Sequence, residues 1–194
     1  MKKQIKTFLQ AAILAAVLSP AAAFAADTYE IDAVHSHALY KIKHLNVGYQ
    51  YGRFKDMKGM VVVDEKTPAN SKVEVVIPTA SVDSNHPKRD EHLKSPDFFD
   101  ATKYPTLTFK STQVKKLSAD TYEVLGNLTL HGVTKPIKFK FKKTGEGKGM
   151  QGEYRLGGEA TLMINRSDFG IKYGLPNVLN DRVDIILAFE GVKQ

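Results

Sequence analysis

The sequence contains no cysteine, so disulfide bonds, thiolate nucleophiles and cysteine-ligated metals are excluded. After residue 25 it also lacks any apolar run long enough to cross a membrane as a helix. No serine stands in a nucleophile motif, no glycine-rich nucleotide loop follows a strand, and no internal repeat is visible. Function must therefore be inferred from the architecture and not from a short catalytic motif.

The charge of the chain is modestly positive. The formal net charge is +7, and the first 25 residues contribute three lysines and no acids, which leaves +4 for the remainder. An excess of this size is expected of a solvated, lysine-rich sheet face, and it favours an anionic membrane surface or a lipid phosphate only weakly. We predict no nucleic-acid partner, because neither the charge nor any known module indicates one.

The first 25 residues have the layout of a secretory signal peptide. Three lysines precede a short apolar core at residues 8–18, and Ala23-Phe24-Ala25 resembles a cleavage site. The apolar core is too short to anchor the chain in a membrane, so we expect export and no stable membrane insertion. Cleavage after Ala25 would leave residues 26–194, a length that predicts a single domain.

Residues 121–143 predict a β-hairpin. Apolar and polar side chains alternate through this stretch, and His131-Gly132 forms a two-residue turn between its halves. Such a turn requires positive φ at both positions, which Gly132 adopts freely and His131 tolerates better than most residues. The predicted pairs are Tyr122 with Phe141, Val124 with Phe139, and Gly126 with Ile137. A slip of one residue would put lysines into the apolar face, so the register is strongly specified.

Similar alternation elsewhere predicts further strands. They lie at residues 29–32, 38–44, 57–64, 72–77, 106–115, 154–165 and 182–190. Together with the hairpin they predict an all-β fold of about eight strands, arranged as an antiparallel barrel or sandwich. Gly158 and Ala160 share the apolar face of one strand and leave space there, as a tapering barrel or a cavity requires.

Two connections interrupt this pattern. Residues 49–54, which contain Gly52 and follow Gly48, are interpreted as a bend or a short helical turn. Residues 85–104 place apolar side chains among charges, with prolines inside and just after the segment. We predict one or two short helices within this long loop. A connection of this length in a compact domain is more often functional, or a lid, than passive.

Five motifs occur in order along the chain. They are His35-Ser36 with His44-Leu45; GRFKDMKG at 52–59; RDEHLKSPDFFDATKYPTLTF at 89–109; LTLHGVTKPI at 128–137; and NRSDFGI at 165–171. Together they resemble the YceI-like, polyisoprenoid-binding proteins of bacteria. The resemblance implies an eight-stranded antiparallel lipocalin-like β-barrel that holds a long isoprenoid lipid in its apolar lumen. It also implies export to the periplasm, a homodimer in many members, and no established catalytic activity.

This resemblance implies that inward side chains contact a lipid, such as a polyprenyl carrier or a quinone-like molecule. No cofactor is expected besides this ligand. The predicted lumen residues are Tyr40, Ile42, Val75, Ile77, Phe109, Val124, Phe139, Phe141, Leu162, Ile164, Leu187 and Phe189. The same residues would also build an ordinary filled core, as in a structural or adhesive module that binds no lipid.

Arg89, Asp90 and His92 lie close together in the long loop and suggest an alternative function. In an enzyme acting on a lipid or isoprenoid, Asp90 would orient His92 as a general base at the barrel mouth. We prefer a structural interpretation, because one Asp/His pair in a charged loop is common. Ion pairs Arg89–Asp90 and Arg166–Asp168 would then fasten loops at the rim. Alternatively, Arg89 or Arg166 contacts a polar head group, since a guanidinium suits phosphate.

Two other interpretations have less support. His35 and His37 are two residues apart and would share a strand face as metal ligands, but a third ligand, His44 or His92, would have to come from afar. We therefore predict no metal site. An integral outer-membrane barrel would carry apolar side chains outward on strands of about 9–11 residues. Many of the predicted strands are shorter than that.

Overall fold

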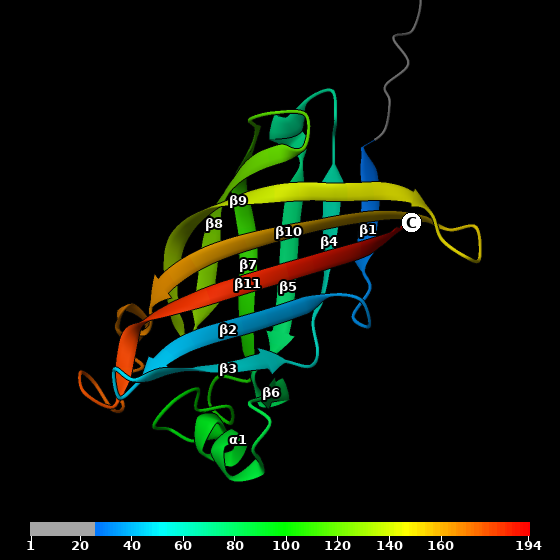
Figure 1. Cartoon of the computed structure of the whole chain (residues 1–194). Helices are drawn as coiled ribbons and strands as arrows, with labels where there is room; N and C mark the ends of the chain where they lie inside the picture. Colours follow the sequence, from blue (N-terminus) through cyan, green and yellow to red (C-terminus); the bar gives the residue numbers. More distant parts are fainter. Residues whose placement is uncertain (1–25) are drawn as a thin grey trace, which may run out of the picture.

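Antiparallel strands dominate the computed structural model, which describes residues 26–194 (Figure 1). Within this range the strands are β1 (Asp27–Ile31), β2 (His37–His44), β3 (Gly48–Phe54), β4 (Lys58–Val63), β5 (Lys72–Pro78), β6 (Val82–Asp83), β7 (Thr106–Lys116), β8 (Thr121–Leu130), β9 (Val133–Lys148), β10 (Tyr154–Asn165) and β11 (Leu179–Lys193). The helical elements of the same range are α1 (Pro87–Lys94) and the short 3-10 helices η1 (Pro68–Asn70), η2 (Thr79–Ser81) and η3 (Arg166–Phe169). The predicted signal peptide, residues 1–25, lies outside the described residues.

Among residues 26–194, eight strands close into a barrel. Their order is β1-β4-β5-β7-β8-β9-β10-β11, and the end of β11 pairs back with β1, where Gly191 lies opposite Ile31. All of the pairings in this ring are antiparallel. The predicted all-β class and eight-stranded antiparallel barrel are confirmed.

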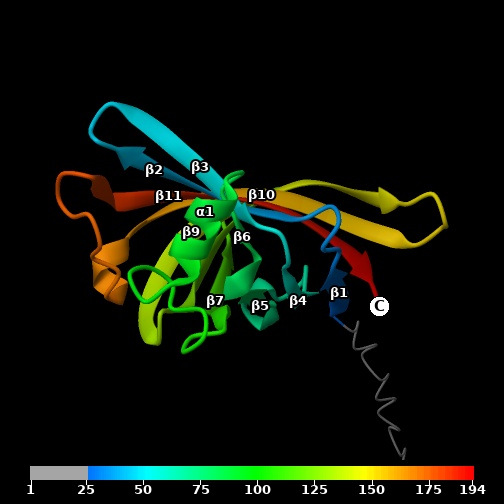
Figure 2. The same ribbon diagram turned by 90° about the horizontal axis from the view of Figure 1, so that it is seen from below.

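Three further strands extend the barrel wall on one side. The first part of β11 pairs with β2 instead of β1, with Val183 opposite Ile42 and Ala188 opposite His37. β3 pairs with β2, and the short β6 pairs with β3. The views show β9, β10, β11, β2 and β3 lying obliquely across β4, β5 and β7 (Figures 1 and 2). Side chains between these two layers form the barrel interior.

β3 corrects the prediction of a bend or a short helical turn at residues 49–54. Gly52 suggested a break in the strand pattern, but it lies directly opposite Tyr40 of β2. A Cβ atom on Gly52 would overlap the ring and hydroxyl group of Tyr40, so only glycine leaves room for this side chain. The glycine therefore serves packing between two strands and not a turn.

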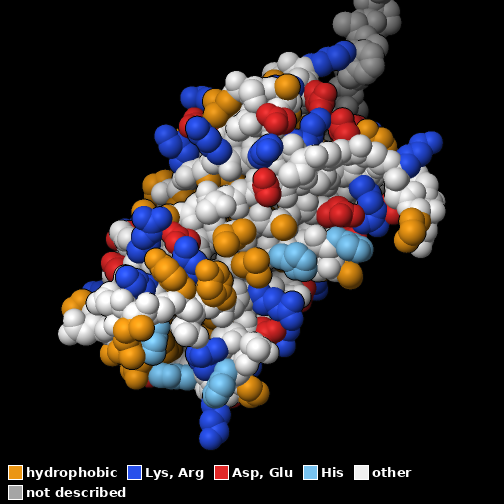
Figure 3. Space-filling view, in the orientation of Figure 1, with side chains coloured by type: hydrophobic (Ala, Val, Ile, Leu, Met, Phe, Trp, Pro, Cys, Tyr) orange, Lys and Arg blue, Asp and Glu red, His pale blue; other side chains and the backbone are white. Residues whose placement is uncertain are grey.

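The β8–β9 hairpin has the predicted register. Val124 lies opposite Phe139, and the turn residues have φ of 51° at His131 and 74° at Gly132. Both values are positive, as the two-residue turn requires. The lysines that alternate with the apolar residues of β9 are exposed. Lys and Arg side chains are interspersed with Asp and Glu over the visible face of the molecule (Figure 3).

The segment between β6 and β7 contains the helix α1, which agrees with the prediction of one or two short helices. Pro87 stands in its first turn, and the side chain of His86 accepts a hydrogen bond from the Arg89 amide, as is typical of helix N-termini. After α1 the chain brings Phe98 into the core beside Leu107. This segment covers one end of the barrel (Figure 1). Among residues 26–194, no helix is long and apolar enough to span a membrane.

Candidate functional site

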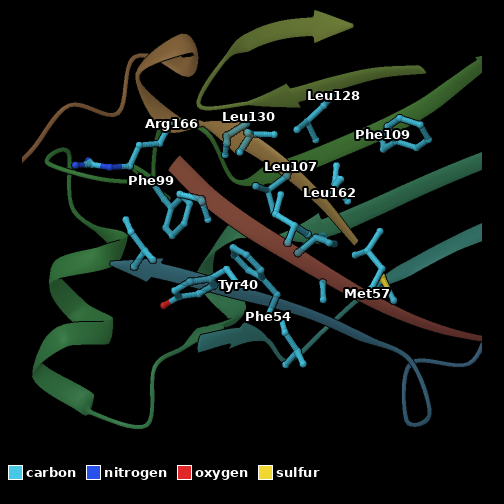
Figure 4. Close-up of a pocket in the computed structure, with 18 of the residues that line it drawn as sticks. Tyr40, Phe54, Met57, Phe99, Leu107, Phe109, Leu128, Leu130, Leu162 and Arg166 are labelled. Carbon is cyan, nitrogen blue, oxygen red and sulfur yellow. The ribbon is translucent and has the colours of Figure 1, made fainter. Parts of the chain in front are cut away.

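An apolar cavity of about 520 Å³ lies inside the barrel (Figure 4). Its wall consists of inward side chains from both layers of strands and from the segment around α1. All twelve residues predicted for the lumen lie in this wall: Tyr40, Ile42, Val75, Ile77, Phe109, Val124, Phe139, Phe141, Leu162, Ile164, Leu187 and Phe189. Their contact with a lipid stays a prediction.

The alternation of side chains along each strand decides which residues form the wall. Leu162 of β10 lines the cavity, whereas the next residue, Met163, is 48% exposed on the outside of the barrel. On β5, Ile77 lines the cavity and its neighbour Val76 is 41% exposed. Strand position, and not hydrophobicity alone, therefore separates the wall from the outer surface.

The cap over one end of the cavity was not among the predicted lumen residues. Leu93, Phe98 and Phe99 from the α1 segment line the cavity, and the ring of Phe99 packs edge-on against Phe54 with centroids 5.5 Å apart. Other wall residues outside the prediction include Met57, Leu107, Leu128, Leu130, Ile171 and Leu179. The Phe98-Phe99 pair was the sequence signal that could have predicted this cap, because apolar rings in a charged loop need a buried partner.

Polar side chains gather at the capped end of the cavity. Arg89, His92, Gln50 and His44 belong to its lining. Arg89 donates hydrogen bonds from Nε to Ser84 Oγ at 2.8 Å, from Nη2 to the Ser84 carbonyl at 2.6 Å, and from Nη1 to Gln50 Oε1 at 3.3 Å. Arg89 is both exposed and part of the lining, so it stands where the cavity meets solvent.

Tyr40 brings a neutral phenol to the same end of the cavity. Burial raises the pKa of Tyr40 to about 12, and this outweighs the opposing influence of Arg89. The hydroxyl group lies on the side of the ring nearest α1 (Figure 4). A phenol that stays protonated can donate a hydrogen bond to an oxygen of a ligand.

Arg166 is buried beside the cavity and ties a loop to β11. It is 4% exposed. It donates hydrogen bonds to the carbonyls of Asn180 at 2.9 Å, Leu179 at 3.1 Å and Ile171 at 3.3 Å. Burial lowers the pKa of Arg166, and the nearby Asp181 carboxylate partly opposes this shift. Arg166 therefore joins the start of β11 to the loop that contains Ile171.

The two predicted ion pairs are wrong: within the described residues, neither Arg89–Asp90 nor Arg166–Asp168 forms. The guanidinium of Arg166 bonds backbone carbonyls. Asp90 Oδ1 accepts hydrogen bonds from the Ser84 amide at 2.7 Å and from the Ser84 hydroxyl at 2.5 Å. Arg89 also bonds Ser84, so the two residues fasten the start of α1 through a shared serine.

The pairing of Asp90 with His92, considered only for the alternative function as an enzyme, does not form either. His92 Nε2 lies 2.8 Å from Asp97 Oδ2. Its ring packs edge-on against Phe98 and Tyr173, with centroids 5.0 and 4.9 Å apart. Residues two apart on a helix do not face each other, which explains why Asp90 and His92 find different partners. The imidazole is therefore oriented by Asp97 and packed as part of the cap.

A compact charged cluster lies where β1, β10 and β11 meet. Ligand atoms of Asp32, His35 and Glu190 lie within 4.8 Å of one another, a spacing that could suit a metal ion. Arg155 already contacts both carboxylates, with Nη1 2.8 Å from Asp32 Oδ2 and paired also with Glu190. His35 lies in a turn before β2 begins at His37, so these two histidines do not share the strand face considered from the sequence.

Comparison with known families gives a match over most of the chain. Residues 29–191 match the model of the YceI-like domain. A UPF0312 protein of Pseudomonas aeruginosa (strain LESB58) is 44% identical over 191 residues, which cover 97% of this chain and 98% of that protein. UPF0312 protein YE1254 of Yersinia enterocolitica is 45% identical over 190 residues, covering 97% of each chain.

Solved structures have a similar fold. BcnA of Burkholderia cenocepacia has a TM-score of 0.75 at 24% identity, covering 82% of this chain and 98% of that one. A YceI protein of Campylobacter jejuni has a TM-score of 0.68 at 31% identity, covering 78% and 90%. A polyisoprenoid binding domain from Saccharophagus degradans, implicated in plant cell wall breakdown, has a TM-score of 0.67 at 17% identity, covering 86% and 98%. The first and third of these likenesses concern the fold alone.

Proposed function

Because the chain belongs to the YceI-like family, matched over residues 29–191, we propose that it binds an isoprenoid lipid in the barrel cavity and carries it in the periplasm. The observation that supports this most is the apolar cavity of about 520 Å³ enclosed by the barrel. A core that served stability alone would fill this volume with side chains, because empty apolar space loses packing contacts. A cavity of this size suits a small-molecule ligand.

Burial of hydrocarbon would supply most of the affinity. An isoprenoid chain gains about 25 cal/mol for each Å² of apolar surface that leaves water. The wall between the mouth and the far end consists of side chains such as Phe109, Leu162 and Leu187, which offer no polar contacts. Such a ligand needs few hydrogen bonds, which is why the binding site has no short sequence motif.

We expect the polar end of the ligand at the capped end of the cavity, where Arg89 and Tyr40 lie. Arg89 is exposed there and carries a permanent positive charge that suits a phosphate. Arg166 is the second candidate for a head-group contact. A guanidinium has five N–H donors, and three of those of Arg166 bond backbone carbonyls. The remaining two N–H groups can contact a ligand while the other three hold the backbone.

The proposal also includes the subcellular location and the oligomeric state. The periplasm is supported by the sequence of residues 1–25, which has the layout of a secretory signal peptide. A polyprenyl carrier or a quinone-like molecule is favoured as the ligand, since the similar domain from Saccharophagus degradans is described as polyisoprenoid binding. A homodimer is expected from the family resemblance.

Catalysis is the competing function. Asp90 is engaged by Ser84, and His92 by Asp97, so the acid–base pair on which an enzyme mechanism would depend is not assembled at the mouth. A carrier returns its ligand unchanged, whereas an enzyme returns a product. Recovery of the bound molecule in chemically intact form therefore separates the two functions.

The experiment is native mass spectrometry of protein purified from its own periplasm, followed by organic extraction. We expect one intact isoprenoid per subunit, and the same spectrum counts the subunits. Leu162→Arg places a charge in the cavity wall and should lose the lipid. Met163→Arg, on the exposed face of the same strand, is the matched control and should keep it. Circular dichroism verifies that both variants fold. Lipid retained by folded Leu162→Arg protein, or a wild-type protein that stays empty after isoprenoids are added, would overturn the proposal.

A further inference from the structure

The barrel interior contains a second cavity beyond the first. It has a volume of about 540 Å³ and lies at the end of the barrel opposite α1, where β9 ends and β10 begins. Its apolar lining includes Tyr29, Val114, Tyr122 and Leu156. Charged side chains also belong to its lining: Asp27, Asp64, Glu65, Lys66, Lys143, Glu146 and Lys193. Two chambers therefore lie in series along the lumen.

The boundary between the chambers falls at the same level on neighbouring strands. The side chains that line both chambers are Val61, Val73 and Phe141. On β9, Phe139 lines only the first chamber, and Phe141, two residues later, lines both. On β8, Val124 lines only the first chamber and Tyr122 only the second. Since Tyr122 is the strand partner of Phe141, the division passes through this pair.

Phe141 is the bulky member of the boundary, and the neighbouring strand is shaped to hold its ring. A Cβ atom on Gly158 of β10 would overlap the Phe141 ring, so the ring occupies the space that this glycine leaves. Across β10 it meets Phe189 of β11, with centroids 6.1 Å apart and planes inclined at 68°. The space at Gly158 is therefore filled by an aromatic side chain and does not widen the lumen.

The rings of Phe141 and Phe189 project from one layer of the barrel. Val61 and Val73 belong to β4 and β5 in the other layer (Figure 2). Val61 and Val73 are strand partners and lie side by side. They are small and their χ1 angles are restricted, so the side that can open or close the passage is the side of Phe141. Phe141 is thus the bulkiest of the three side chains that line both chambers.

We propose that Phe141 is the floor of the ligand chamber and sets the length of isoprenoid chain that the protein accepts. This inference rests on the proposed function. The polar groups of the first chamber lie at its capped end, so the hydrocarbon tail of a ligand bound there points toward Phe141. A chain that fits the first chamber leaves the ring in place. A longer chain must displace the ring, and its end then enters the second chamber.

The experiment measures affinities for isoprenoid alcohols of increasing length, namely farnesol, geranylgeraniol and solanesol, by displacement of a fluorescent fatty-acid probe. Phe141→Ala joins the chambers and removes the ring that a long chain must displace. The affinity of this variant for solanesol relative to farnesol should rise about tenfold or more, which corresponds to about 1.4 kcal/mol. Phe141→Leu, which keeps an apolar side chain and disturbs folding less, should shift the ratio in the same direction by a smaller factor.

Phe139→Ala is the matched control. It removes the same ring from the same face of β9, but Phe139 lines only the first chamber. This variant should therefore leave the ratio of solanesol to farnesol affinity close to the wild-type value. An unchanged ratio in folded Phe141→Ala and Phe141→Leu proteins, or an equal rise in Phe139→Ala, would overturn the inference while the proposed function stands. A wild-type protein that binds none of the three alcohols would instead overturn the proposed function.

Discussion

The hydroxyl group of Ser36 bonds both backbone polar groups of Glu190. It donates to the Glu190 carbonyl at 3.0 Å and accepts from the Glu190 amide at 2.9 Å. Glu190 lies at the point where β11 changes partners, since Ala188 still pairs with β2 and Gly191 already pairs with β1. The serine thus bridges the fork at which the closed barrel and the β2–β3 extension separate.

Ser36→Ala is expected to destabilise the protein. The Glu190 amide would lose its partner in a region where Ser36 is 5% exposed, and an unsatisfied buried donor costs about 1–3 kcal/mol. Urea unfolding measures the loss. Ser118→Ala is the control, because the Ser118 hydroxyl bonds only the neighbouring Asp120 carboxylate on the surface. Its effect should be within about 0.5 kcal/mol, and equal effects of the two substitutions would contradict the assigned role.

The tight turn of the β8–β9 hairpin leads to a second prediction. Gly132 has φ of 74°, and a Cβ atom there would overlap the ring of Tyr104. The preceding residue, His131, packs on the same ring with centroids 4.6 Å apart. Gly132→Ala therefore combines backbone strain with a steric clash, and we expect a loss of about 1–3 kcal/mol in the free energy of unfolding.

A glycine at the other end of β9 provides the control for this turn. Gly145 has no atom within 4 Å of an added Cβ, and its φ is not positive. Gly145→Ala should therefore leave stability nearly unchanged when both variants are unfolded thermally under the same conditions. A large loss in Gly145→Ala, or none in Gly132→Ala, would show that the special geometry of the turn is not what requires glycine.

The alternation of apolar and polar residues was sufficient to predict the register of this hairpin and twelve of the strand residues that line the cavity. Both depend on the period of two, which sends successive side chains to opposite faces wherever a strand exists. Leu162 and Met163 are both apolar, yet their positions in the strand separate inside from outside. A pattern of this kind needs no knowledge of distant parts of the chain.

The predictions that failed all concerned contacts between side chains, and the partner in each contact is set by the folded structure and not by the local sequence pattern. Gly52 resembled a turn residue, but the ring of Tyr40 on the adjacent strand explains it. Asp90 lies next to Arg89 in the sequence, yet it bonds Ser84. The division of the lumen was likewise invisible, because it arises from one side chain reaching across a neighbouring strand. Sequence spacing contains no such information.

A pH dependence follows from the cluster around Asp32. The hydrogen bond from His35, followed by that from Arg155, holds the pKa of Asp32 well below its usual range. A carboxyl group with a depressed folded-state pKa stabilises the protein above its unfolded-state pKa of about 4, and this contribution is lost as the pH falls through the folded-state pKa. Stability contributed by Asp32 should therefore be complete at neutral pH and decline below about pH 5.

Asp32→Asn isolates this contribution. The difference in unfolding free energy between wild type and variant should be largest near neutral pH and shrink in acid, as measured by urea unfolding at a series of pH values. His35→Gln keeps the carboxylate and Arg155, so it should remove only part of the pH-dependent difference. A difference between wild type and Asp32→Asn that stays constant down to about pH 3 would contradict the depressed pKa.

The two arginines of the cavity should respond differently to the same substitution. Arg166 is buried and bonds three backbone carbonyls. Arg166→Met leaves these acceptors without their donor and should cost about 1–3 kcal/mol of stability. Arg166→Lys should not restore it fully, because an ammonium group lacks the planar fork that reaches three acceptors. Arg89 is exposed at the mouth, so Arg89→Met should cost less stability than Arg166→Met, although it removes the hydrogen bonds to Ser84.

For ligand binding we expect the opposite order, with the larger effect from substitution of Arg89. If Arg89 contacts the head group, Arg89→Met should weaken binding of farnesyl phosphate several-fold relative to farnesol, because the charge acts only on the phosphate and the shared hydrocarbon chain is unaffected. Isothermal titration calorimetry with both ligands measures this ratio, and high salt should reduce the wild-type preference for the phosphate. A folded Arg89→Met protein with an unchanged ratio would move the head-group contact away from Arg89. A ratio lost only in Arg166→Met would assign it to the two N–H groups of Arg166 that its loop leaves unused.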